Sequence, residues 1–190
     1  MKIGLFFGSF NPIHIGHMII ANVMVEETDL EKVWFVISPQ NPFKQRKDLL
    51  HEFDRFDMVR TAIFDNYNLD VTDVEFNMPK PSYTVDTLAY LSSAHPDKEF
   101  RLIIGQDNLH AFHKWKNYKV LLEDYGLYVY PRPGASENEM SSHPNVKMVK
   151  APLLDISATY IRKCIRKGKS VKYLVHPAVE EMRMSRKFYI

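Results

Sequence analysis

The stretch KIGLFFGSFNPIHIGH, residues 2–17, decides the fold that we expect for this chain. Residues 2–7 are almost continuously apolar, which predicts a short buried strand. The apolar run at residues 18–25 predicts a helix, so residues 8–17 form the first strand-to-helix turn. Turns of this kind, at the carboxyl end of a parallel strand, bind nucleotide phosphates through backbone N–H groups and the start of the helix.

Two histidines are the unusual feature of this turn. His14 and His17 lie three residues apart, which places both on the same side of the first helical turn. Neither stands beside an acidic residue that would mark a hydrolase base, and both can donate N–H groups to phosphate oxygens. The alternatives are histidines satisfied in the core or a chance pair on the surface, but the turn with Gly8 and Ser9 favours phosphate binding. A zinc site is disfavoured because no Cys or carboxylate lies nearby as a further ligand.

Length and composition predict one globular domain over residues 1–190, with 45% hydrophobic residues to form its core. A net charge of +2 is too small to predict a general nucleic-acid surface. The single cysteine, Cys164, excludes an internal disulfide and fits a reducing cytoplasm. There is no leader-like beginning, and no apolar run approaches the roughly 20 residues that span a bilayer. We therefore expect a cytoplasmic protein without a membrane segment.

Beyond the first helix, apolar runs alternate with segments of helical periodicity. Strands are expected at residues 32–37, 69–74, 100–104, 126–130 and 146–149, and helices at 53–64, 85–94, 118–123, 157–168 and 179–185. In the helix at 53–64 the apolar residues at helical spacing are Phe53, Phe56, Val59 and Ile63, and Ser82 or Thr84 is expected to cap the helix at 85–94. The alternation predicts an α/β fold: a Rossmann-like doubly wound parallel sheet flanked by helices, with a small C-terminal helical segment.

A second candidate element is the segment ISATYIR, residues 156–162. Ser157 and Thr159 are natural helix-capping residues whatever the function. Arg162 lies one turn into this helix, where a guanidinium can hold a polyphosphate near the free N–H groups of the helix start. Lys44 and Arg46 follow the second strand and would reach the same edge of the sheet, although isolated basic residues are commonly solvated surface charges.

These segments together resemble a known family. Residues 8–17 resemble the G-x-F-D-P-x-H-x-G-H motif of the nucleotidyltransferase superfamily, and residues 156–162 resemble its I-S-S-T-x-I-R motif. Further segments resemble the nicotinate-nucleotide adenylyltransferase family: NPFK at 41–44, PSYTVDTL at 81–88, IGQD at 104–107 followed by Trp115, and YLVHPAV at 173–179. The resemblance covers nearly the whole chain, with the segments in the expected order.

The resemblance implies an enzyme of NAD biosynthesis that joins ATP and nicotinate mononucleotide, releasing pyrophosphate. It implies that His14, His17, Arg162 and Lys44 are catalytic, with the histidines on the α- and β-phosphates and Arg162 on the departing pyrophosphate. The remaining ATP-binding residues would be Gly8, Ser9, Phe10, Gly105, Asp107, Ser157 and Thr159. Nicotinate mononucleotide would contact Lys44, Tyr83, Thr84, Trp115 and Arg132, the last from the polar loop at 131–144.

Magnesium is expected as the cofactor, bound mainly through ATP phosphates, so no residue is predicted as a metal ligand. The expected partners are ATP and nicotinate mononucleotide, without nucleic acid or membrane, and a homo-oligomer is left open. Trp115 has the alternative of packing in the core. Three departures from the family motifs are Asn11 for Asp, Phe43 for Pro and Ala158 for Ser, and the His that precedes the family's Lys is missing before Lys44.

Three other functions remain as alternatives at this point. A sibling adenylyltransferase would use nicotinamide mononucleotide or phosphopantetheine. A class I aminoacyl-tRNA synthetase would share the H-I-G-H motif of residues 14–17, but the chain is too short for an anticodon-binding domain, and its only K-M-S-K-S-like segment lies at the C-terminus. A non-catalytic nucleotide sensor would need the glycine turn but not His14, His17 and Arg162 together.

Overall fold

The computed structural model describes residues 1–39, 48–136 and 138–190. Within these residues, six strands form one parallel sheet in the order β3-β2-β1-β4-β5-β6. Their bounds are β1 (Lys2–Gly8), β2 (Lys32–Ile37), β3 (Leu69–Thr72), β4 (Glu99–Gly105), β5 (Leu127–Tyr130) and β6 (Val146–Met148). Each predicted strand is therefore confirmed, and so is the Rossmann-like doubly wound fold.

Helices cover both faces of the sheet because successive strand residues point to opposite sides. Ile3 and Leu5 of β1 face one core cluster, while Phe6 faces the other. The Phe6 side is covered by α1 (Ile15–Glu26), α2 (Glu52–Ala62), α6 (Ala158–Arg166) and α7 (Pro177–Ser185). The Leu5 side is covered by α3 (Thr84–Ala94), α4 (Gln106–Leu109), α5 (Tyr118–Val120) and the short helical segments Phe112–Lys114 and Leu121–Tyr125. Two further single turns are Val74–Asn77 and Glu139–Ser142.

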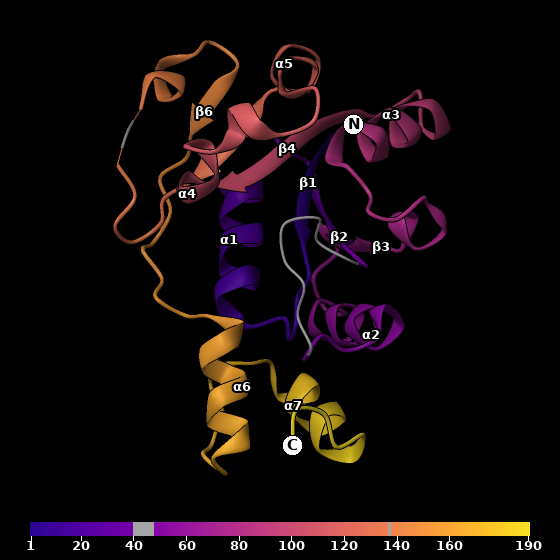
Figure 1. Cartoon of the computed structure of the whole chain (residues 1–190), viewed down its shortest axis with the longest axis vertical. Helices are drawn as coiled ribbons and strands as arrows, with labels where there is room; N and C mark the ends of the chain where they lie inside the picture. Colours follow the sequence, from indigo (N-terminus) through magenta and orange to yellow (C-terminus); the bar gives the residue numbers. More distant parts are fainter. Residues whose placement is uncertain (40–47, 137) are drawn as a thin grey trace.

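The strand order reverses at β1, because β2 lies on one side of it and β4 on the other. The loops after β1 and β4 therefore diverge, which opens a crevice at the carboxyl ends of these strands. Figure 1 shows α6 and α7 at the opposite end of the molecule from the N-terminus, with α6 reached by a long connection after β6. The N-terminus of α1 contacts the segment between α6 and α7, since the Ile15 N–H donates to the Leu174 carbonyl at 2.9 Å.

The helix predicted at residues 53–64 is confirmed as α2, whose buried residues are Arg55, Met58, Val59 and Ala62, while Phe53 is 58% exposed. One local prediction is wrong. Neither Ser82 nor Thr84 caps α3, because Tyr83 is the N-cap residue, Thr84 is already helical, and the Ser82 hydroxyl donates instead to the buried carboxylate of Glu75 at 2.8 Å. The buried carboxylate of Glu75 offers the Ser82 hydroxyl a partner that takes the place of the capping bond.

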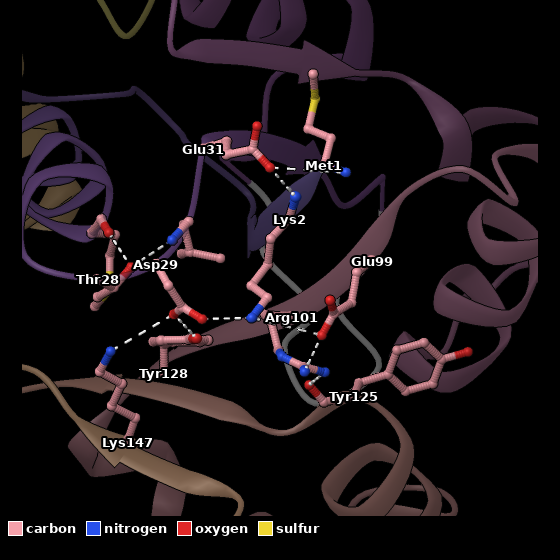
Figure 2. Close-up of polar contacts among 12 residues, drawn as sticks. Met1, Lys2, Thr28, Asp29, Glu31, Glu99, Arg101, Tyr125, Tyr128 and Lys147 are labelled. Carbon is pink, nitrogen blue, oxygen red and sulfur yellow. Dashed lines mark hydrogen bonds and ion pairs between the residues drawn. The ribbon is translucent and has the colours of Figure 1, made fainter.

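A network of charged residues links the amino ends of several strands (Figure 2). Asp29 accepts hydrogen bonds from Lys2 and from the Tyr128 hydroxyl, and its carboxylate lies 3.7 Å from the Lys147 ammonium. The bond from Lys2, followed by that from Tyr128, lowers the pKa of Asp29 below its usual range. Among the described residues, no helix is both long and apolar enough to cross a lipid bilayer.

Candidate active site

A cleft of about 310 Å³ opens at the carboxyl ends of β1, β4 and β5. It lies between the turn after β1, the loop after β5 and the start of α6. Nine of the residues predicted for the site line it: Gly8, Ser9, Phe10, His14, His17, Asp107, Arg132, Ser157 and Thr159. The N-terminal and C-terminal motifs, more than 130 residues apart in sequence, thus meet in one cavity.

The two histidines are stacked at the start of α1. Their ring centroids lie 3.7 Å apart with an interplanar angle of 22°. The backbone N–H of His14 donates to Nδ1 of His17 at 3.3 Å, which makes Nδ1 an acceptor and leaves the proton of a neutral His17 on Nε2. Gly16 makes room for this arrangement, because a Cβ there would lie 3.1 Å from the His14 ring.

His14 is buried, and its Nδ1 has no hydrogen-bond partner within the described part of the chain. A buried polar atom without a hydrogen-bond partner destabilises the fold. A ligand that forms a hydrogen bond with this atom removes that penalty, which favours binding. Burial, with a smaller effect of Arg132, lowers the pKa of His14 to about 4. Burial, then His14 and Arg132, lowers the pKa of His17 well below its usual value. Both rings are therefore neutral at pH 7.

The depressed pKa of His14 predicts a pH dependence of stability. The folded protein binds fewer protons at this residue than the unfolded chain between about pH 6.5 and pH 4. The free energy of unfolding should therefore fall as the pH falls through this window, by about 3 kcal/mol for a shift of this size. Denaturant titrations at pH 7, 5.5 and 4.5 measure it, with His14→Gln as the comparison. Equal pH slopes in the two proteins would contradict the prediction.

The start of α6 forms the opposite wall of the cleft. Ser157 caps the helix as predicted, with its hydroxyl accepting from the Tyr160 N–H at 3.2 Å. Arg162 lies behind this wall and is buried. Its guanidinium donates to the Asp48 carboxylate at 2.8 Å, to the Asn11 carbonyl at 2.7 Å and to the Thr159 hydroxyl at 3.4 Å. Arg162 therefore supports two residues of the cleft lining, Asn11 and Thr159. Its contact with a polyphosphate stays a prediction.

Arg132 lies near both histidines, a position that the sequence did not predict. It lines the same cleft, 3.6 Å from the Asp107 carboxylate, and its charge contributes to lowering the pKa of both histidines. Gly105 lies behind this pair, where a Cβ would approach Asp107 to 2.4 Å. The sequence assigned Arg132 to nicotinate mononucleotide, whereas its position also suits a phosphate beside the histidines.

Tyr83, Thr84 and Trp115 form a separate group outside the lining of the cleft. Lys116, next to Trp115 in the sequence, links this segment to α3: its ammonium lies 2.8 Å from Asp86 of α3 and 4.6 Å from the centre of the Tyr83 ring. Trp115 packs on Phe112, with ring centroids 5.3 Å apart, and is partly buried. Of the predicted nicotinate residues, Tyr83 thus lies near Lys116, the neighbour of Trp115, whereas Arg132 lines the cleft and Lys44 falls outside the described residues. Trp115 has the core contact that was its alternative role.

Lys44 and Arg46 lie outside the described residues, so their predicted roles have no structural account. Within the described ranges, no group of three His, Cys, Asp or Glu side chains could hold a metal ion. Asp107 is the carboxylate in the described cleft lining, and it faces Arg132. These residues do not build a magnesium site of their own, and binding of magnesium through ATP phosphates stays a prediction.

Comparison with known proteins places the chain in a family. Residues 5–164 match the cytidylyltransferase-like family. A probable nicotinate-nucleotide adenylyltransferase from Cytophaga hutchinsonii is 60% identical over 189 residues, covering 100% of this chain and 98% of that protein. This chain belongs to the nicotinate-nucleotide adenylyltransferase family. A second probable member, from Flavobacterium johnsoniae, is 47% identical over 191 residues, with 100% and 99% coverage.

Solved structures of nicotinate-nucleotide adenylyltransferases share the fold. The Plasmodium falciparum nicotinic acid mononucleotide adenylyltransferase complexed with NaAD superposes with a TM-score of 0.84 at 20% identity, covering 99% of this chain and 97% of that chain. The same enzyme complexed with APC gives a TM-score of 0.82 at 20% identity, with 99% and 96% coverage. These structures confirm the fold, while the sequence relatives confirm the family resemblance.

Proposed function

We propose that this protein transfers the adenylyl group of ATP to nicotinate mononucleotide, forming nicotinate adenine dinucleotide and pyrophosphate. The observation that carries the proposal is the stacked histidine pair at the start of α1, which lines one cleft with Ser157 and Thr159 of α6. Membership of the nicotinate-nucleotide adenylyltransferase family supports the choice of both substrates.

In the proposed reaction, a 5′-phosphate oxygen of nicotinate mononucleotide attacks the α-phosphorus of ATP in line. The bond from the α-phosphorus to the oxygen that bridges the α- and β-phosphates breaks, and that oxygen leaves with pyrophosphate. The attacking phosphate is a monoester with a second pKa of about 6, so it is already ionised at pH 7 and needs no general base. The protein's task is to place the two substrates and to stabilise the charge that develops on the phosphates.

The neutral histidines suit this task as hydrogen-bond donors. Nε2 of His17 carries its proton because Nδ1 accepts from the backbone. His14 offers a buried Nδ1 that is unpaired within the described residues. Arg132 supplies a positive charge in the same cleft, and the free N–H groups at the start of α6 favour an anion at the opposite wall. Donors fixed in advance of the reaction stabilise a transition state without reorganising.

The reaction is tested by the release of pyrophosphate from ATP, with and without nicotinate mononucleotide. The proposal expects release that depends on the mononucleotide and yields the dinucleotide in equal amount. Both substrates are metabolites of the cell interior, and a cytoplasmic location is proposed with them. A protein that binds ATP but releases no pyrophosphate in the presence of nicotinate mononucleotide would be a sensor rather than an enzyme.

A further inference from the structure

Arg55 of α2 is the largest fully buried side chain in the described structure, and it has an unusual set of partners. Its guanidinium pairs with no carboxylate among the described residues. Its hydrogen bonds within the described part of the chain all go to backbone carbonyls instead: Ser9 at 2.7 Å, Ser38 at 2.9 Å, Pro39 at 3.1 Å and Leu50 at 2.9 Å. Burial lowers the pKa of Arg55 to about 10, so the side chain is still a cation at pH 7.

These four carbonyls belong to three segments at the carboxyl edge of the sheet. Ser9 follows β1, Ser38 and Pro39 follow β2, and Leu50 precedes α2. A guanidinium donates five N–H groups in a fixed planar fork, so it can hold several carbonyls in one geometry. Burying a cation without a carboxylate partner is costly, and an apolar residue such as the neighbouring Met58 or Val59 would fill the space without that cost. Core packing alone therefore does not explain an arginine here.

The segment that Arg55 holds at Ser9 leads directly to the histidines. The next residue, Phe10, has a φ of 43°, in the left-handed region that large side chains rarely adopt. This conformation costs about 1 kcal/mol and persists only where surrounding contacts enforce it. The Phe10 ring packs edge-to-face on His17, with ring centroids 5.0 Å apart and an interplanar angle of 78°. Contacts therefore run from Arg55 through Ser9 and Phe10 to His17.

We propose that Arg55 is a positioning residue for the adenylyl-transfer site, which fixes His17 through the backbone of Ser9 and the ring of Phe10. The proposal rests on the proposed function for its catalytic consequence. Its structural part, the placement of the His17 ring, holds independently of which reaction the cleft performs. Arg55 is not among the residues that line the described cleft, and the Ser9 carbonyl is the one lining group to which it donates a hydrogen bond there, so it acts through other groups and not on the substrate.

The test compares Arg55→Lys, which keeps the charge but loses the planar fork, with Arg55→Met, which loses both. Leu88→Ala is the matched control, because Leu88 is equally buried but lies in the core on the other face of the sheet. Each variant is measured for unfolding free energy, for kcat and KM with both substrates, and for the NMR signals of its histidine rings. His95, which packs on Trp34, serves as the internal reference signal.

We expect the His17 signal to shift or broaden in both Arg55 variants and to stay unchanged in Leu88→Ala, with His95 unchanged throughout. We expect kcat/KM for ATP to fall about 10- to 100-fold in Arg55→Met, which is the size of effect that a misplaced group produces. If neither Arg55 variant folds, Phe10→Leu tests the same chain of contacts and should displace the His17 signal with Arg55 in place.

An unchanged His17 signal in a folded Arg55 variant, or in Phe10→Leu where that variant is needed, would overturn the proposal. So would a fall in kcat/KM no larger than that of Leu88→Ala. Failure of the proposed function looks different: wild-type protein would then release no pyrophosphate, while the NMR comparison would still decide whether Arg55 positions His17.

Discussion

Replacing His17 by alanine is expected to lower kcat for pyrophosphate release by about 10²- to 10³-fold, the size of effect seen when one fixed donor to a developing anion is removed. His17 is placed for this role by three contacts: its Nδ1 accepts from the His14 N–H, its ring stacks on His14, and Phe10 packs against its edge. Alanine removes the Nε2 donor and leaves the backbone of α1 intact. Turnover is measured with saturating ATP and nicotinate mononucleotide.

The control for this prediction is His113→Ala, because His113 is an exposed residue outside the lining of the cleft. Its turnover should equal that of the wild-type protein. Thermal unfolding of His17→Ala should show that the fold is retained. A folded His17→Ala protein with turnover within about threefold of wild type would remove His17 from the mechanism.

The second large effect is expected from Arg162→Ala, which should lower both stability and turnover. The substitution removes the donor that Arg162 supplies to the Asn11 carbonyl, and among the described residues it leaves Asp48 paired with Arg166 alone. Removing one partner of a buried ion pair costs about 3 kcal/mol or more, and we expect the lower end because Asp48 is partly exposed. Chemical denaturation measures this loss.

The effect of Arg162 on turnover is separated from its effect on stability by Asp48→Ala. That variant removes the same ion pair but keeps the guanidinium at the rear of the cleft. If Arg162 stabilises the departing pyrophosphate, as the sequence predicts, Arg162→Ala loses at least about tenfold more turnover than Asp48→Ala, a difference of roughly 1.4 kcal/mol in activation free energy. Equal losses would show that Arg162 serves only to brace Asn11 and Thr159.

Much of the fold could be predicted because the central strands are buried on both faces. Residues 33–37 are therefore a continuous apolar run, residues 100–104 are apolar except for Arg101, and the alternation of strands with helical segments predicts a parallel sheet. The order of the strands carries no comparable local signal. Helix α2 shows that apolar spacing can predict a helix without predicting which residues are buried: Arg55 is buried because four backbone carbonyls accept its hydrogen bonds, while Phe53 is exposed.

The candidate site was predictable where its residues lie in short motifs with their own chemistry. His14, His17 and Ser157 line the cleft as the spacing indicated. Arg132 was assigned to the other substrate because its position next to Asp107 and the histidines depends on how β4 and β5 pair. The role of Asp48 could not be predicted from the sequence, because its partners Arg162 and Arg166 lie more than 110 residues away in the chain.

The most direct test of the central claim is the rate of pyrophosphate release from ATP with nicotinate mononucleotide, compared with nicotinamide mononucleotide under the same conditions. We expect faster turnover with the acid, and loss of that turnover in His17→Ala. Faster turnover with the amide would contradict the choice of substrate. The absence of pyrophosphate release with either mononucleotide would contradict adenylyl transfer itself.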